Sequence, residues 1–174
     1  QNLFRMTGDV RYADYYERAM FNHILSTQHP EHGGYVYFTS ARPAHYRVYS
    51  APNSGMWCCV GTGMENHGKY GEFIYTHTDD ELYVNLFVAS QLNWKEKKFV
   101  IKQETNFPSE ETVRLTVDSR KAQTLKIKIR CPWWVKPGEM KVICKGKDYA
   151  VGAQPSSYIE IERRWKKGDV IEVT

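Results

Sequence analysis

The spacing of apolar residues changes near Asp79-Asp80, and this change constrains the fold more than any other feature of the sequence. Before it, apolar residues recur every three or four positions between Val10 and Thr27, which is the period of an α-helix. After it, runs such as 82–88, 113–117 and 125–130 alternate apolar and polar residues, which is the period of a β-strand. The two periods predict a mixed α and β protein, with helices over 1–78 and an antiparallel β-sandwich over 79–174.

The helical part is expected to contain two principal helices. A break at Thr7-Gly8-Asp9 precedes the first, over 10–27, and residues before Gly8 resemble the end of an earlier helix. The second is predicted from about Cys59 to Tyr75, and it contains three glycines after its first turn. Each glycine costs a helix ~1 kcal/mol relative to alanine, so this helix is expected to pack closely against its neighbours. Between the helices, 35–38 is predicted as a short aromatic strand or extended segment and 42–55 as a loop.

The composition excludes several classes of protein. Lys plus Arg number 24 and Asp plus Glu 20, which gives a net charge of +4 spread along the chain. The densest basic run, Lys95 to Lys98, is interrupted by Glu96, so no nucleic-acid partner is expected. No apolar run approaches the ~20 residues of a membrane span, so no membrane partner is expected. The aromatic content of 14% excludes a disordered chain and is typical of proteins that stack on sugars or bases.

Both ends of the sequence are typical of a piece of a larger protein. The chain starts at Gln1 rather than at an initiator methionine, and it ends at Thr174 within a strand-like alternation. We therefore expect the remainder of the same protein to be a partner of these residues.

The segment 53–67 concentrates reactive groups around the adjacent cysteines Cys58 and Cys59. Both fall near the predicted start of the second helix, where the helix dipole and free N–H groups stabilise a thiolate. Two thiols at a helix start can converge on one cation, although adjacent cysteines are also common as small buried residues. Zinc requires about four ligands, and Glu65 and His67 lie ~10 Å further along the helix. If the pair binds zinc, the other ligands come from elsewhere.

Other residues have two interpretations each. His45 lies in the loop before the cysteines and suits either a hydrogen bond to a sugar hydroxyl or plain solvent exposure. Trp57 suits either a stacking wall beside a sugar or a core position under the loop. Glu65 is expected to make a buried structural hydrogen bond. Trp133-Trp134 is expected to pack within the protein rather than to bind sugar, and Cys131 and Cys144 to be ordinary strand residues.

Three stretches, 7–18, 57–66 and 82–87, resemble the β-L-arabinofuranosidase glycoside hydrolase group, families 127 and 146. The resemblance covers nearly the whole chain in order, and Trp57-Cys58-Cys59-Val60-Gly61 is its most specific part. It implies the last helices of an (α/α)6 barrel followed by a β-sandwich, and a retaining exo-glycosidase with a cysteine nucleophile in a zinc site of three Cys and one Glu. Carried over by position, Cys58 would be the nucleophile and a zinc ligand, and Cys59 a second ligand. The remaining ligands and the acid/base Glu would lie upstream of Gln1.

The expected function is therefore part of an enzyme that releases terminal β-L-arabinofuranose, or a related sugar, from oligosaccharides or polysaccharides of plants. This piece is expected to be inactive by itself. Two alternatives are a non-catalytic carbohydrate-binding sandwich and a zinc-stabilised structural domain. A glycan substrate is typical of a periplasmic or secreted parent protein, but intracellular relatives exist, so the sequence leaves the localisation open.

Overall fold

The computed structural model describes all residues from Gln1 to Thr174, which form two compact units. The larger unit contains Gln1–Asp14 together with Phe73–Thr174, and the smaller unit contains Tyr15–Glu72. None of the helices is both long and apolar enough to cross a bilayer.

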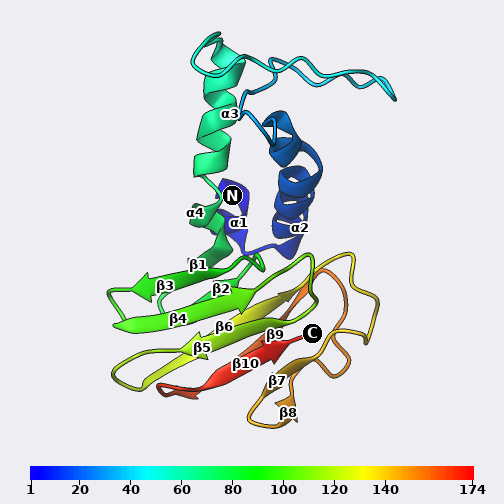
Figure 1. Cartoon of the computed structure of the whole chain (residues 1–174). Helices are drawn as coiled ribbons and strands as arrows, with labels where there is room; N and C mark the ends of the chain where they lie inside the picture. Colours follow the sequence, from blue (N-terminus) through cyan, green and yellow to red (C-terminus); the bar gives the residue numbers. More distant parts are fainter. The chain divides into compact units, whose positions relative to one another are not determined.

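The larger unit contains two β-sheets, as the alternating pattern predicts (Figure 1). One sheet has the strand order β1-β2-β6-β9 and the other has the order β3-β4-β5-β10-β7-β8. The strands are β1 (Tyr75–His77), β2 (Glu81–Val84), β3 (Ser90–Trp94), β4 (Phe99–Thr105), β5 (Val113–Val117), β6 (Gln123–Cys131), β7 (Val142–Cys144), β8 (Lys147–Asp148), β9 (Ser157–Trp165) and β10 (Val170–Val173).

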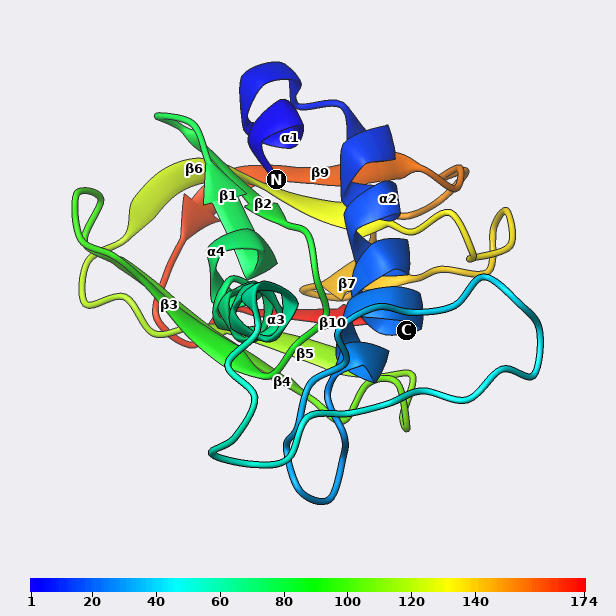
Figure 2. The ribbon, with the colours of Figure 1, turned by 90° about the horizontal axis from the view of Figure 1, so that it is seen from above.

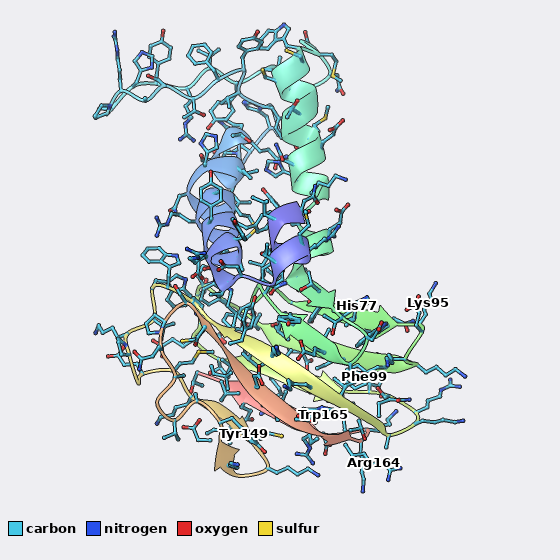
Figure 3. The ribbon with its side chains drawn as sticks, turned by 180° about the vertical axis from the view of Figure 1, so that it is seen from behind. His77, Lys95, Phe99, Tyr149, Arg164 and Trp165 are labelled. Atoms are coloured by element: carbon cyan, nitrogen blue, oxygen red, sulfur yellow. The ribbon has the colours of Figure 1, made fainter.

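The inward-facing residues of both sheets form one apolar core. Leu82 on β2 and Ile127 on β6 come from the smaller sheet, and Ile101 on β4 and Leu115 on β5 from the larger one. Phe99 and Trp165 are also completely buried (Figure 3). Two sheets that bury their facing side chains in this way form a sandwich.

One neighbouring pair of strands departs from the expected antiparallel arrangement. β2 and β6 pair in parallel, with Leu82 opposite Ile127 and Val84 opposite Ile129. Between them the chain passes through β3, β4 and β5 of the other sheet. A tight hairpin would force antiparallel pairing, but a long crossover does not, and the sheet is therefore mixed.

Helix α1 (Asn2–Thr7) belongs to the larger unit and lies next to β9 (Figure 2). Its buried Phe4 contacts Phe73 and Tyr83 edge to face, with ring centroids 5.3 and 5.9 Å apart. Gly8 ends the helix with a φ of 67°, a conformation that glycine adopts without strain. Helix α2 (Val10–Ala19) follows, and the Asp9 carboxylate caps it by accepting the Arg11 backbone N–H at 3.0 Å.

A buried polar cluster, here called the Arg130 cluster, connects the start of α2 to the sandwich. Arg130 is fully buried and donates from Nη1 to Asp14 Oδ1 at 2.7 Å and from Nε to the Asn85 carbonyl oxygen at 2.6 Å. The other Asp14 oxygen accepts from Ser156 Oγ at 2.6 Å, and the Tyr158 hydroxyl donates to Asn85 Oδ1 at 2.6 Å. Burial raises the pKa of Tyr158, so this phenol stays protonated.

The smaller unit is built from short helices and a long connection. The chain leaves α2 through a π-turn, η1 (Met20–Ile24), and a 3₁₀-turn, η2 (Leu25–Thr27), so the predicted helix over 10–27 is helical throughout but not a regular α-helix. After the connection come α3 (Cys58–Gly68) and α4 (Gly71–Ile74), the last two residues of which belong to the larger unit.

Two local expectations differ in outcome from the structure. The stretch 35–38, expected as a strand or an extended segment, forms isolated bridges, Gln28 with Tyr35 and Val36 with Tyr49, and no regular strand. The second helix is interrupted after α3, and Tyr75 begins β1 instead of ending a helix. The four α-helices do not amount to an (α/α)6 barrel, which stays a prediction.

Candidate active site

The adjacent cysteines occupy the first turn of α3, the helix so labelled in Figure 1. Trp57 precedes the helix with an extended backbone, φ −74° and ψ 156°, and Cys58 is its first residue. The Cys58 side chain is exposed and the Cys59 side chain is half-buried. The N-terminus of an eleven-residue helix presents unpaired N–H groups and the positive end of the dipole, both of which favour a thiolate.

The two sulfur atoms lie at a distance that suits a shared cation. Cys58 Sγ and Cys59 Sγ are 3.8 Å apart. Two thiolates bound to one zinc at ~2.3 Å in a tetrahedral shell are separated by about 3.8 Å. The hydrogen bond with Cys58, followed by burial, raises the pKa of Cys59 and so opposes the effect of the helix N-terminus at this residue. The pair therefore has the donor chemistry and the spacing of half a zinc site.

The rest of the chain does not complete such a shell. No three His, Cys, Asp or Glu side chains come together as a metal-binding group. His67 Nδ1 donates to the Gly63 carbonyl oxygen of the preceding helical turn at 2.8 Å. Glu65 is exposed, so the buried structural role expected for it is wrong; the side chain lies on a solvent-facing side of α3.

An aromatic hollow of about 400 Å³ lies in the same unit as the cysteine pair. It is lined by Tyr37, Phe38, His45, Tyr46, Val48 and Trp57. The His45 and Tyr46 rings stack 4.7 Å apart, and the Tyr37 and Trp57 rings meet edge to face at 6.0 Å. Flat apolar faces with a few polar tips are suited to the C–H faces and hydroxyls of a sugar.

Tyr37 connects this hollow to the cysteines. The negative charge of the Cys58 and Cys59 thiolates, together with a hydrogen bond to Cys58, raises the pKa of Tyr37. The phenol therefore stays protonated and remains available as a donor beside the sulfur atoms. The hollow and the thiols lie in the same unit, residues 15–72.

The structure brings His45 and Trp57 to one hollow, although they are twelve positions apart in the sequence. Their roles toward a substrate stay predictions. Sequence reasoning missed Tyr37, Phe38 and Val48 as lining residues, because 35–38 was expected to be a strand or extended segment and 42–55 a loop. Three aromatic residues within four positions, Tyr35, Tyr37 and Phe38, are a signal that a strand alone does not explain.

The other reactive or aromatic residues lie in the sandwich. Cys131 and Cys144 are buried strand residues, as expected. Trp134 stacks on Phe107 with ring centroids 5.7 Å apart, which agrees with the packing role expected for it, although its side chain remains 44% exposed.

Comparison with solved structures assigns the chain to the glycoside hydrolases. A structure titled "Glycoside hydrolase" is 28% identical and superposes over 99% of this chain with a TM-score of 0.79. A GH127 β-arabinofuranosidase is 27% identical over 98% of the chain with a TM-score of 0.81. The GH127 β-L-arabinofuranosidase Ara127N-Se from Geobacillus stearothermophilus T6 is 27% identical over 98%, with a TM-score of 0.76.

Family models give the more specific assignment. The model of the β-L-arabinofuranosidase GH127 middle domain matches residues 81–174, and that of the GH127 catalytic domain matches residues 1–72. The chain belongs to the GH127 family of glycoside hydrolases. It spans 29–30% of the length of the solved structures that it resembles. A search of curated protein sequences finds no match to this chain.

Proposed function

We propose that this chain is part of a retaining exo-glycosidase that releases terminal β-L-arabinofuranose, or a related sugar, from plant glycans. Membership of the GH127 family supports the reaction class. The observation that carries the assignment to residues is the thiol pair at the N-terminus of α3, 3.8 Å apart and connected through Tyr37 to an aromatic hollow.

In this proposal Cys58 is the nucleophile. Its thiolate attacks the anomeric carbon of the sugar, the carbon–sulfur bond forms, and the bond to the leaving oxygen breaks. The leaving oxygen takes its proton from a general acid, which then acts as the base for the water that releases the sugar. We place this acid/base in the segment of the enzyme that precedes Gln1. Trp57 and His45 would hold the furanose, by stacking and by a hydrogen bond respectively.

Zinc is the proposed cofactor, and the donor set fits it. Cys58 and Cys59 would hold the ion, with a further Cys and a Glu from the preceding segment. Zinc would supply the positive charge that keeps a thiolate deprotonated at neutral pH. With two thiols alone, this chain is expected to bind zinc weakly, because two ligands do not close a tetrahedral shell.

The exposure of Cys58 favours the catalytic proposal over a zinc-stabilised structural domain. Structural zinc sites are closed, whereas catalytic sites leave one position open to substrate. Cys58 is exposed, and Tyr37, whose pKa the Cys58 charge raises, lines the hollow. The hollow lies outside the sandwich, which also argues against a function limited to a carbohydrate-binding sandwich. We retain 1–78 as the end of the barrel and 79–174 as the sandwich domain.

The test uses the parent enzyme that contains this chain, with zinc content and hydrolysis of a nitrophenyl β-L-arabinofuranoside as readouts. Cys58→Ser should abolish turnover with the fold intact, since a serine hydroxyl is rarely ionised at neutral pH. Cys59→Ser should lower zinc content first and activity as a consequence. Cys144→Ala, in the sandwich, is the matched control and should keep both.

An electrophilic arabinofuranose analogue should label Cys58, as located by mass spectrometry. Near-normal activity of Cys58→Ser, or a label on a carboxylate, would contradict the cysteine mechanism. The 174-residue chain alone should show no turnover above background, and turnover comparable to that of the parent would show that the acid/base lies within these residues.

A further inference from the structure

The sandwich carries a basic surface that the sequence does not reveal. A hollow of about 530 Å³, here called the basic hollow, lies where the β3–β4 hairpin meets the connection from β5 to β6. It is lined by Gln91, Asn93, Lys95, Lys98, Val100, Asp118, Arg120 and Lys121. Lys95 lies at the turn of the hairpin (Figure 3). Four cationic side chains therefore surround one opening, although they come from two separate turns.

The three lysines have no anionic partners of their own, whereas the Arg120 charge acts on Asp118 and helps to lower the pKa of that carboxyl. Lys95, Lys98 and Lys121 are exposed and make no ion pair or side-chain hydrogen bond. The only carboxylate in the lining, Asp118, is paired with Lys167 at 2.7 Å. The other charged residues of the hairpin turn, Glu96 and Lys97, do not line the hollow. The opening thus has an excess of positive charge that an anionic ligand would neutralise.

The two turns are held together before any ligand binds. The buried Ser119 hydroxyl accepts the Val100 backbone N–H at 2.8 Å, and the Asp118 N–H donates to the Val100 carbonyl oxygen at 2.9 Å. These bonds connect the β5–β6 turn to β4 beside the hairpin. A surface that is already ordered loses less entropy when it binds a chain-like ligand.

We propose that the basic hollow binds an acidic polysaccharide, a chain of uronate sugars with one carboxylate per residue. The ammonium and guanidinium groups suit the carboxylates. The exposed amides of Gln91 and Asn93 make no other side-chain hydrogen bond, and amides both donate to and accept from sugar hydroxyls.

The lining argues for this ligand over single-stranded nucleic acid. Nucleic-acid surfaces combine positive charge with aromatic rings on which bases stack, and no aromatic side chain lines this hollow. The inference is independent of the proposed glycosidase activity, because the basic hollow lies entirely in the larger unit and binding requires no catalysis. It would give the enzyme a second attachment to a glycan that carries both acidic and neutral sugars.

The experiment measures binding of sodium polygalacturonate to this chain by calorimetry or by affinity electrophoresis. Binding should weaken as salt is raised, because screening reduces attraction between exposed charges. Polygalacturonate whose carboxyls are methyl esters should bind at least about tenfold more weakly.

Replacing the three lysines of the hollow with glutamine (Lys95→Gln, Lys98→Gln and Lys121→Gln) should lower affinity about tenfold or more. The matched control replaces three exposed lysines elsewhere on the sandwich (Lys136→Gln, Lys141→Gln and Lys147→Gln). Each triple variant lowers the net charge from +4 by three, to +1, so the two variants are matched in net charge. Far-UV circular dichroism confirms that both variants fold.

Equal losses in the two variants would show attraction to net charge alone and would overturn the proposal. Unchanged binding in the first variant, or equal binding of the methyl ester, would also overturn it. Tighter binding of oligo(dT) than of polygalacturonate at equal charge would identify a nucleic-acid surface instead.

Discussion

Replacing Arg130 with methionine tests whether the start of α2 is held to the sandwich by a buried charge. The Arg130 side chain is completely buried and the Asp14 side chain is 10% exposed, with 2.7 Å between Nη1 and Oδ1. Removing one partner of a buried ion pair costs about 3–5 kcal/mol, because the other charge stays buried without compensation. Methionine fills much of the volume, so cavity formation adds little. Ser156 would still donate to Asp14, which favours the lower end of that range.

The assay is urea unfolding at neutral pH, followed by tryptophan fluorescence and circular dichroism. A loss of ~3 kcal/mol at unchanged m-value is expected, which is a large share of the ~5–15 kcal/mol of a typical domain. Arg114→Met is the control, because its pair with Glu172 is about half exposed on both sides and should contribute at most ~1 kcal/mol.

A double variant separates the pair from simple loss of packing. Arg130→Met combined with Asp14→Leu should cost less than the sum of the two single changes, with a coupling of about 1–3 kcal/mol. Strict additivity, or a loss below ~1 kcal/mol for Arg130→Met alone, would refute the reasoning.

Three further predictions concern other parts of the chain. Gly63→Ala should lower the free energy of unfolding by about 1–3 kcal/mol in thermal or urea unfolding, because its Cβ would lie 2.8 Å from a tyrosine ring. Gly61→Ala is the control: it has open space around it and should be neutral or stabilise the chain by up to ~1 kcal/mol. A hydrogen bond from a neighbouring tyrosine, aided by nearby lysine ammonium groups, lowers the pKa of Glu81. The ionised Glu81 carboxylate therefore stabilises the folded chain fully above the ordinary carboxyl pKa, and this contribution is lost as pH falls through the lowered pKa of the folded state. Between about pH 7 and pH 3, the urea midpoint of Glu81→Gln should fall less steeply than that of the unmodified chain. Iodoacetamide should alkylate exposed Cys58 well before buried Cys144 in the folded chain, as peptide mapping would show, and equal rates would contradict the burial described here.

The strands were predictable because their signal is local. The alternation in 113–117 and 125–130 reports which face of each strand is buried, and both segments are strands in the structure. The parallel pairing of β2 with β6 was not predictable in the same way, because it depends on a crossover through the other sheet. The alternation also misplaced Arg130, which occupies a polar position of the 125–130 alternation together with Lys126 and Lys128 but is completely buried.

The candidate site was predictable only in part. Cys58 and Cys59 stand out because thiols are rare and their position at a helix start follows from the local pattern. The aromatic hollow depends on the path of the connection 28–57, which is set by contacts such as the 3.1 Å hydrogen bond from the Tyr35 N–H to Ser50 Oγ. The basic hollow was hidden for a similar reason, since Arg120 and Lys121 join Lys95 only through the packing of two turns.

The Arg130 cluster also shows why a sequence boundary and a packing boundary need not coincide. The catalytic-domain model ends at residue 72 and the middle-domain model starts at residue 81, yet Asp14 from the first match is bonded to Arg130 from the second. Phe4 packs against Tyr158 of β9 in the same unit. A buried ion pair is worth little net stability compared with apolar packing, but it penalises every arrangement that leaves one charge alone. The pair therefore penalises every placement of the first turns of α2 on the sandwich except the one that brings Asp14 to Arg130.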